Sequence, residues 1–221
     1  MNKLLMEQLE RCILLSLEKQ DKMASLLGDQ SGHLDLDTGV IRFNDTHECS
    51  FQVLGTESDN TLSWLWAWAD EQTEIPGDLL EASLRLKAWG EQENIPEFSM
   101  PAVDLNRADG RALSLIATEV GKASCYYADH YEGGAAFVLL SCRAIDSQPS
   151  LDIAALSRHF PDVISLYELN RKNALLSYLV KKGIAYEEKG PEIVCELESG
   201  ETLRAVFDDA GRMLSLNGKE I

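Results

Sequence analysis

Three tryptophans alternate along one short stretch, and this pattern constrains the fold more than any other feature of the sequence. Residues 55–70 read GTESDNTLSWLWAWAD, so Trp64, Trp66 and Trp68 occupy every second position after a polar turn. Side chains two residues apart on a β-strand share one face of a sheet. The stretch therefore predicts a strand over residues 61–69 with three indoles on one face. Other elements must cover that face, or it remains as a docking surface.

Two amphipathic helices are predicted near this strand, and each has an apolar face that needs a surface to cover. The first spans residues 2–27, with Asn2 as its N-cap and Gly28 as its end, and the second spans residues 78–89, ended by Gly90. We therefore expect Trp64 and Trp66 to lie in the core. Trp68, next to Asp70, is the tryptophan that we would test first for a binding role.

The remaining pattern of the first 146 residues predicts an antiparallel sheet. The earlier strands of a meander are expected at residues 33–36, 40–43 and 48–55, separated by short turns. After the second helix come an extended connector at residues 96–105 and a third helix at 110–120, capped by Asp109. A hairpin follows, in which Gly133-Gly134 joins the strands 124–132 and 135–143. The second of these is apolar on both faces, which predicts a central strand.

The last third of the chain predicts a smaller unit of helix plus antiparallel meander. A short helix is expected at residues 151–160, and a capping box at Ser165–Glu168 begins a longer one that ends with Lys182 and Gly183. Strands are expected at residues 184–187, 192–197, 201–207 and 212–216, with these side chains inward: Ile193, Cys195, Leu197, Leu203, Ala205, Phe207, Leu214 and Leu216. The chain is thus predicted to be an α+β protein, with a domain at residues 1–146 and a unit at 147–221 that is either separate or shares the same core.

The charge of the chain restricts its partners. With a formal net charge of −17, the chain repels nucleic acids and anionic membranes and attracts basic proteins. Acidic residues are densest between Asp70 and Asp109. The only long apolar run near the N-terminus, residues 12–17, is too short for a membrane span or a signal peptide. We therefore expect a cytoplasmic protein that binds neither membrane nor nucleic acid; its oligomeric state is left open.

Motifs for catalysis, metal binding or cofactor binding are not apparent. The five cysteines include no C-x-x-C pair, so we predict neither a zinc site nor a redox pair, and most cysteines should be small buried hydrophobes. The four histidines are scattered, and the sequence contains no phosphate loop, nucleophile elbow or H-E-x-x-H motif. The candidate ligand- or partner-binding residues are instead the tryptophans with nearby carboxylates: Trp64, Trp66, Trp68, Glu57, Asp59 and Asp70.

The tryptophan stretch also carries a family resemblance. Phe51–Ser58, the strand Trp64–Ala69 and the amphipathic helix that follows resemble a family of uncharacterised bacterial domains. That family is marked by a G-T/S-x-S turn followed by a W-x-W-A-W-A strand, and the resemblance covers residues 5–143. Asp70 stands where the family pattern has asparagine. The resemblance implies an α+β domain and no established activity.

Three functions remain as hypotheses. The first is a non-enzymatic binding protein whose acidic segment 70–109 meets a basic partner, for example an immunity-type protein that neutralises a basic toxin. The second is a small-ligand binder or hydrolytic enzyme with a pocket walled by the tryptophans and with Glu57, Asp59 or Asp70 at its mouth. The third is a structural or assembly domain.

Overall fold

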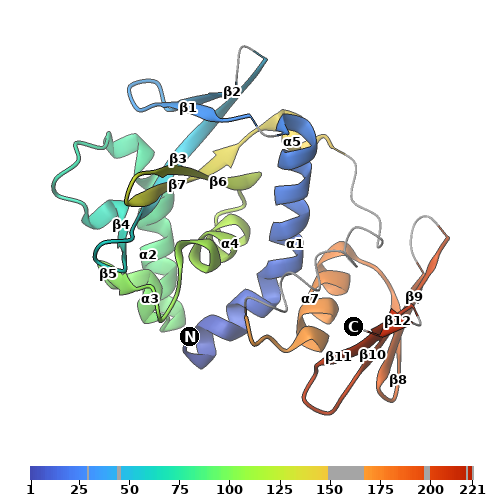
Figure 1. Cartoon of the computed structure of the whole chain (residues 1–221). Coiled ribbons are helices and arrows are strands. Elements are labelled where there is room, and N and C mark those ends of the chain that lie inside the picture. The colour runs from blue at the N-terminus through green and yellow to red at the C-terminus, as the bar shows by residue number, and fades with distance from the viewer. Residues whose placement is uncertain (29, 44–45, 149–166, 197–199, 218, 221) are drawn as a thin grey trace. The chain divides into compact units, whose positions relative to one another are not determined.

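The fold is α+β, as predicted (Figure 1). The structure is a computed structural model and describes residues 1–28, 30–43, 46–148, 167–196, 200–217 and 219–220. Contacts within the chain define two compact units. Unit 1 comprises Met1–Leu5 and Lys19–Pro149, and unit 2 comprises Met6–Glu18 and Ser150–Ile221.

Helix α1 (Lys3–Leu27) contributes residues to both units and confirms the predicted helix ends. The side chain of Asn2 accepts a hydrogen bond from the backbone N–H of Leu5 at 2.9 Å, which satisfies one of the unpaired donors of the first turn. Gly28 follows the helix with φ +58°. A positive φ is costly for residues with a Cβ, so glycine is well suited to this end.

Unit 1 is built on an antiparallel seven-stranded sheet, here called sheet A. Its strands are β1 (Gly32–Asp35), β2 (Val40–Phe43), β3 (His47–Ser58), β4 (Ser63–Trp66), β5 (Ala102–Asp104), β6 (Cys125–Tyr131) and β7 (Gly134–Ser141). The long strand β3 pairs with β2 and then β4 along one edge and with β7 along the other. Figure 1 shows the β1–β2 hairpin projecting from one end of the sheet, away from helices α2, α3 and α4.

Strand β7 lies between β3 and β6, which confirms the central position predicted from its apolar sequence. Val138 and Leu140 belong to a buried cluster that also contains Phe51. Phe137 and Leu139 point to the opposite face, where they approach the two ends of helix α4 at Gly110 and Gly121. Both faces of the strand are therefore covered.

The helices of unit 1 are α2 (Glu81–Glu93), α3 (Pro96–Ser99), α4 (Gly110–Val120) and α5 (Arg143–Asp146), with 3₁₀ turns η1 (Ala67–Ala69) and η2 (Gly77–Leu79). Helix α4 has the predicted bounds, and the carboxylate of Asp109 caps it by accepting from the N–H of Ala112 at 2.7 Å. The short helix α5 directly follows strand β7 and ends at Asp146, the last residue of the predicted first domain.

The predicted strand at residues 61–69 is too long, because β4 ends at Trp66. Beyond Trp66 the chain turns into η1, closed by a hydrogen bond from the N–H of Asp70 to the carbonyl of Ala67. Strand β5 pairs with β4 only as far as Leu65, so it gives residues 67–69 no ladder partner. Trp68 therefore does not share the strand face of Trp64 and Trp66.

Two further expectations for unit 1 are wrong. Gly90 lies inside α2 rather than at its end, because a Cβ at Gly90 would collide with Phe98 of α3 and glycine allows that close approach. Helix α2 instead ends at Asn94, which adopts the left-handed conformation. The predicted connector at 96–105 forms helix α3 and strand β5.

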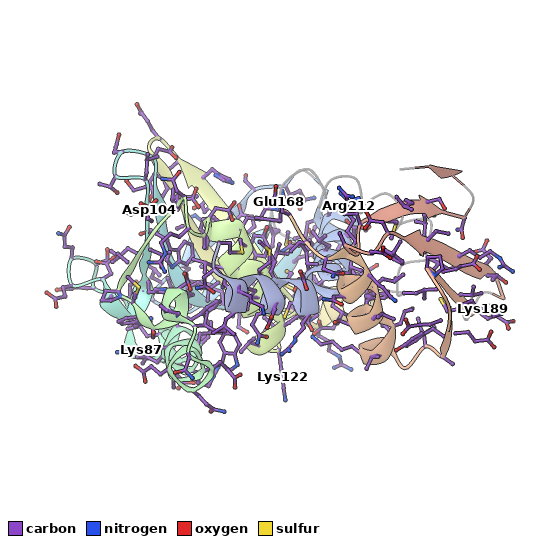
Figure 2. All side chains as sticks on the ribbon, turned by 90° about the horizontal axis from the view of Figure 1, so that it is seen from below. Lys87, Asp104, Lys122, Glu168, Lys189 and Arg212 are labelled. Atoms are coloured by element: carbon purple, nitrogen blue, oxygen red, sulfur yellow. A yellow bond between two sulfur atoms is a disulfide. The ribbon has the colours of Figure 1, made fainter. Side chains whose placement is uncertain are left out.

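Unit 2 contains residues 6–18 of α1, helix α7 (Arg171–Lys182) and a five-stranded antiparallel sheet, here called sheet B. Its strands are β8 (Tyr186–Lys189), β9 (Glu192–Glu196), β10 (Thr202–Phe207), β11 (Met213–Leu216) and β12 (Lys219–Glu220). The predicted meander is confirmed and gains one strand. Figure 2 labels Lys189, the last residue of β8, and Arg212, which directly precedes β11.

Two details of unit 2 differ from expectation. Helix α7 starts at Arg171, capped by Asn170, whereas Glu168 is not helical; Ser165, the helix predicted at 151–160 and Leu197 lie outside the described residues. Leu214 is exposed and Met213 is buried in its place, whereas Leu216 is buried as predicted. The register with β10 shifts between Val206 and Phe207, which leaves Leu214 without a cross-strand partner and turns Met213 inward.

A disulfide joins Cys49 to Cys142, a pair that the sequence does not anticipate, since no cysteines have C-x-x-C spacing and no redox pair is predicted. The two residues are 93 positions apart in sequence but adjacent in space, because Ser50 and Ser141 are cross-strand partners of β3 and β7. Cys12, Cys125 and Cys195 remain thiols and are buried, as expected.

Candidate functional site

Trp64 and Trp66 are fully buried in an aromatic cluster of unit 1. Their ring centroids lie 5.2 Å apart in an edge-to-face arrangement, and Trp64 also lies 5.1 Å from Phe137. The ring of Trp66 lies 5.1 Å from that of Phe98 of α3 in a tilted arrangement, and Phe98 in turn contacts Trp89 of α2. These rings hold β4, α2 and α3 together, and neither Trp64 nor Trp66 presents surface to solvent.

Trp68 lies apart from this cluster and is half-buried beside helix α2. The ammonium of Lys87 stands 4.3 Å from the centroid of its ring, a cation–π contact. Asp70 closes the turn after η1, where its Oδ1 accepts from the N–H groups of Gln72 and Thr73 at 2.9 and 3.2 Å. Partial burial by itself would raise the pKa of Asp70, but these hydrogen bonds outweigh it and hold the pKa below its ordinary value.

Glu57 and Asp59 do not join Trp68 and Asp70. Glu57 accepts a hydrogen bond from the N–H of Gly110 at 2.8 Å, so its carboxylate sits at the N-terminus of α4, where the helix dipole favours negative charge. Asp59 is exposed on the turn between β3 and β4, and its backbone N–H bonds to the carbonyl of Gly133 at 3.0 Å. The six sequence candidates therefore do not form one site: Trp64 and Trp66 are in the buried cluster, Trp68 contacts α2 with Asp70 in the turn after it, Glu57 lies on β3 at the N-terminus of α4, and Asp59 lies on the β3–β4 turn.

The acidic segment 70–109 divides into structural and solvent-facing carboxylates. Asp70 and Asp109 support turns or caps, and Asp104 accepts from the N–H of Asn106 at 2.8 Å. Glu97 is fully buried and pairs with Arg107 at 2.7 Å. The remaining six carboxylates are exposed, and we call them the α2 acidic surface: Glu71, Glu74, Asp78, Glu81, Glu91 and Glu93.

The α2 acidic surface carries little compensating charge. Among the described residues, its only ion pair is between Glu81 and Arg85, at 3.4 Å with both side chains about two-thirds exposed. A pair of this kind contributes little to stability. Along α2, Glu81, Leu84, Ala88 and Glu91 follow at intervals of three and four residues and form one solvent-facing stripe. Leu84 is 48% exposed, so the stripe has an apolar centre between acidic ends.

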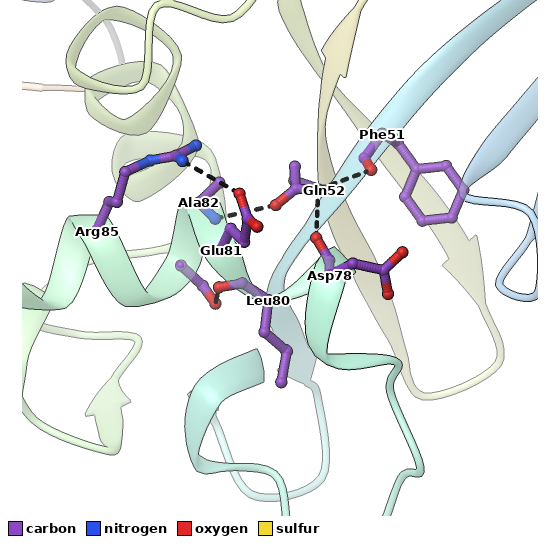
Figure 3. Close-up of polar contacts among 8 residues, drawn as sticks. Phe51, Gln52, Asp78, Leu80, Glu81, Ala82 and Arg85 are labelled. Carbon is purple, nitrogen blue, oxygen red and sulfur yellow. Dashed lines mark hydrogen bonds and ion pairs between the residues drawn. The ribbon is translucent and has the colours of Figure 1, made fainter.

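Gln52 of β3 positions the start of this stripe (Figure 3). Its Oε1 accepts from the N–H of Ala82 at 3.0 Å, and its Nε2 donates to the carbonyl of Asp78 at 2.8 Å. The N-cap residue of α2, Leu80, provides no side-chain hydrogen bond, so Gln52 replaces a local cap. Sequence reasoning missed this role because the two partners lie 26 and 30 positions away.

Three cavities lined by described residues belong to unit 2, and no tryptophan lines any of these three. The largest, about 560 Å³, lies between Asn170 at the N-terminus of α7 and the turns at Gly190 and Gly211. The other two, about 350 and 330 Å³, lie beside Asn173 and beside Tyr186. The described residues also contain no cluster of three metal-ligating side chains and no helix long and apolar enough to cross a membrane.

Comparison with known proteins places the chain in a family. No curated protein and no solved structure matches it. The sequence profile of a family of unknown function, DUF6882, matches residues 7–143, a span that runs from α1 through all of sheet A to the start of α5. The match covers more than half of the chain and confirms the expected likeness to an uncharacterised domain family. The protein belongs to the family of unknown function DUF6882.

Proposed function

We propose that the protein is a non-enzymatic binding protein that uses the α2 acidic surface to dock a basic partner protein in the cytoplasm. The observation that carries this proposal is the stripe of α2, in which half-exposed Leu84 lies between Glu81 and Glu91. Interfaces combine a desolvated apolar centre with a polar rim, and this stripe has that composition. Trp68 and Asp70 lie at the flank of the surface, within reach of a partner bound to α2.

Charge supports a basic partner rather than a neutral one. The six exposed carboxylates lie between residues 71 and 93, a stretch whose basic residues are Arg85 and Lys87, and the whole chain carries a formal net charge of −17. A negative patch of this kind accelerates encounter with a positive one and disfavours acidic competitors. One concrete form of the proposal is an immunity-type protein that masks the cationic site of a basic toxin.

The proposal is tested with a designed probe and two variants of equal charge. The probe is a helical peptide with a leucine stripe flanked by lysines, compared with a scrambled peptide of identical composition. The surface variant carries Glu71→Gln, Glu74→Gln, Glu91→Gln and Glu93→Gln. The control variant carries Asp37→Asn, Glu132→Gln, Glu196→Gln and Asp209→Asn, which are also exposed and lie outside the surface.

Fluorescence anisotropy at low and physiological salt measures the affinity. We expect the surface variant to lose at least tenfold in affinity for the ordered peptide and the control variant about twofold or less. Leu84→Ser should also weaken binding without changing the salt dependence, because it removes apolar contact and no charge. Equal losses in the two charge variants, or equal binding of the scrambled peptide, contradict a defined docking surface.

A further inference from the structure

The disulfide between Cys49 and Cys142 closes one end of the central strand pair of unit 1. Cys49 lies on β3 opposite Ile41 of β2, and Cys142 is the residue that precedes helix α5. The Cα atoms are 4.8 Å apart, within the range that a disulfide spans without backbone movement. One covalent bond therefore connects the β2–β3 hairpin to the end of β7 and the start of α5.

The disulfide lies at the end of the β3–β7 ladder, which makes it reachable by local opening of that ladder. The β3–β7 pairing begins at Ser50 and Ser141, one residue beyond the cysteines. Both serines are exposed, as are Glu48 and Arg143, whereas the cysteines themselves are only 3–4% exposed. Ends of ladders with exposed neighbours open at much lower free energy than a domain core. Opening of β7 at this end would expose the sulfurs to a small reagent without global unfolding, while Cys49 stays paired with Ile41 of β2.

Local hydrogen bonds connect Cys142, and with it the disulfide, to helix α5. The N–H of Cys142 donates to Ser124 Oγ at 2.8 Å, and its carbonyl accepts from the N–H groups of Ile145 and Asp146 at 3.0 and 3.1 Å. Ile145 is fully buried in the same cluster as both cysteines. Helix α5 has four residues and no side-chain cap, so its position depends on these few contacts and on the cross-link.

A third cysteine lies in the same cluster but is chemically distinct. Cys125 on β6 is fully buried, with its Sγ 3.4 Å from Met23 Sδ. Burial raises the pKa of Cys125 to about 12, so this thiol stays protonated at neutral pH. Because the thiolate is the nucleophile in disulfide exchange, Cys125 does not compete for either sulfur of the pair.

We propose that Cys49 and Cys142 form a reversible redox switch that ties β3 to α5 when oxidised and releases the α5 end of unit 1 when reduced. In closure, the thiolate of one cysteine attacks a low-molecular-weight disulfide such as oxidised glutathione and releases one small thiol. The second cysteine thiolate then attacks the mixed disulfide and releases the other small thiol. The protein loses two protons and two electrons, and the oxidant becomes two thiols.

This inference is independent of the α2 acidic surface and fits a protein that acts in a reducing compartment. Disulfides in the cytosol are usually transient, whereas those of exported proteins are permanent. In a native protein held at a defined redox potential, a transient disulfide opens and closes with that potential, whereas a permanent disulfide stays closed.

The test uses the full-length wild-type protein, equilibrated natively in glutathione buffers of graded ratio, quenched with acid, denatured and alkylated. Intact mass should show one transition between three labels and five, and peptide mapping should place the bond at Cys49–Cys142. Cys125→Ser, the matched control, should keep the same midpoint with two and four labels. The double variant Cys49→Ser, Cys142→Ser should carry three labels at every ratio.

Amide hydrogen exchange of the wild-type protein tests whether reduction releases the α5 end of unit 1, and it requires no variant. Reduction should speed amide exchange at residues 47–50 and 142–148 at least tenfold and leave α2 unchanged. Five labels at every ratio, a bond that millimolar thiol leaves intact for hours in the native protein, or unchanged exchange at those residues would each overturn the switch.

Discussion

The indole Nε1 of Trp66 donates a hydrogen bond to the backbone carbonyl of Glu97, 2.8 Å away. This bond connects the last residue of β4 to helix α3, in a site where both side chains are fully buried. Trp64, equally buried on the same strand, has no partner for its Nε1 among the described residues. The two indoles therefore differ in hydrogen bonding while both are fully buried.

This difference gives the first prediction. Trp66→Phe should destabilise the protein by about 2–4 kcal/mol, because it leaves a buried carbonyl without its donor and also creates a small cavity. Trp64→Phe should cost only about 1–2 kcal/mol, because it creates a similar cavity but removes an N–H that has no partner. Urea unfolding of both variants measures the two costs. Equal losses would show that the bond to Glu97 contributes nothing.

The tryptophan stretch also shows how far sequence reasoning reached. Alternation correctly placed Trp64 and Trp66 on one face of a strand, since a period of two is a local property of the backbone. The same alternation extends to Trp68, yet the strand stops at Trp66. Strand length depends on the partner, and β5 lies almost 40 residues later in the chain, so no local pattern indicates where pairing ends.

A second prediction concerns Gln52, which bonds both the N–H of Ala82 and the carbonyl of Asp78 (Figure 3). Gln52→Leu keeps the approximate volume and leaves both backbone groups without this partner, so unfolding should become easier by about 1–3 kcal/mol. Amide exchange at residues 78–84 should accelerate. Gln92→Leu, on the exposed side of α2, is the matched control and should change stability by about 0.5 kcal/mol or less. A loss in the control as large as that of Gln52→Leu would count against the capping role.

A third prediction follows from the hairpin between β6 and β7. The pairing of Tyr131 with Gly134 makes Glu132 and Gly133 the turn residues, so Gly134 already belongs to the strand. A Cβ at Gly134 would collide with the backbone carbonyl of Glu57 on β3. Gly134→Ala should therefore separate β7 from β3 and cost about 2 kcal/mol or more.

Gly77→Ala provides the comparison, because a Cβ there meets no atom within 4 Å and the residue has no positive φ. Its effect on thermal unfolding should stay within about 0.5 kcal/mol. Comparable melting temperatures for the two variants would contradict the close approach at Gly134.

A fourth prediction concerns alkaline pH and unit 2. The hydroxyl of Tyr178 donates to the buried carboxylate of Glu18 at 2.9 Å, and Lys182 lies 2.7 Å from the same carboxylate. Burial, together with the charge of Glu18, raises the pKa of Tyr178 above its ordinary value. In the unfolded chain this hydroxyl ionises near pH 10, while the folded protein retains the proton. The stabilisation is thus complete below about pH 10 and declines as pH rises toward the folded pKa.

Urea unfolding from pH 8 to 11 measures this effect. Tyr178→Phe should lower stability by about 1–2 kcal/mol at pH 8 and should lose less than the wild type on going to pH 11. Cys125 and Tyr126, whose pKa values are also raised by burial, titrate in both proteins and cancel in the comparison. Parallel pH profiles for the two proteins would exclude the linkage to Tyr178.

Local signals predicted the features that depend on neighbours in sequence. The caps at Asn2 and Asp109, the ends at Gly28 and Gly183, and the alternation in β9 and β10 are set within a few residues, and the structure confirms them. Distant contacts decided the rest. In the sequence Gly90 resembles a helix end, and only its close contact with Phe98 explains a glycine inside the helix. Nothing near Cys49 in the sequence indicates that it pairs with Cys142.

The candidate site was predictable only in its charge. The number of carboxylates between residues 70 and 109 can be read from the sequence. Which of them are buried, as Glu97 is, and which are exposed, as Glu91 is, depends on the fold. The exposure of Leu84 could not be predicted from the sequence, because its spacing from Leu80 is typical of the buried face of a helix.

The pairing of α1 with the C-terminal helix has a consequence for synthesis. Glu10 accepts from the N–H of Asn170 at 2.8 Å, and Glu18 contacts Tyr178 and Lys182, so these carboxylates meet their partners across 160–164 residues. At typical elongation rates of 5–20 residues per second, the ribosome takes roughly 10–30 s to make that length of chain. During that time residues 6–18 of α1 lack their hydrogen-bonding partners in and before α7. The newly synthesised unit 1 must therefore tolerate a helix whose other contacting residues have not yet been translated.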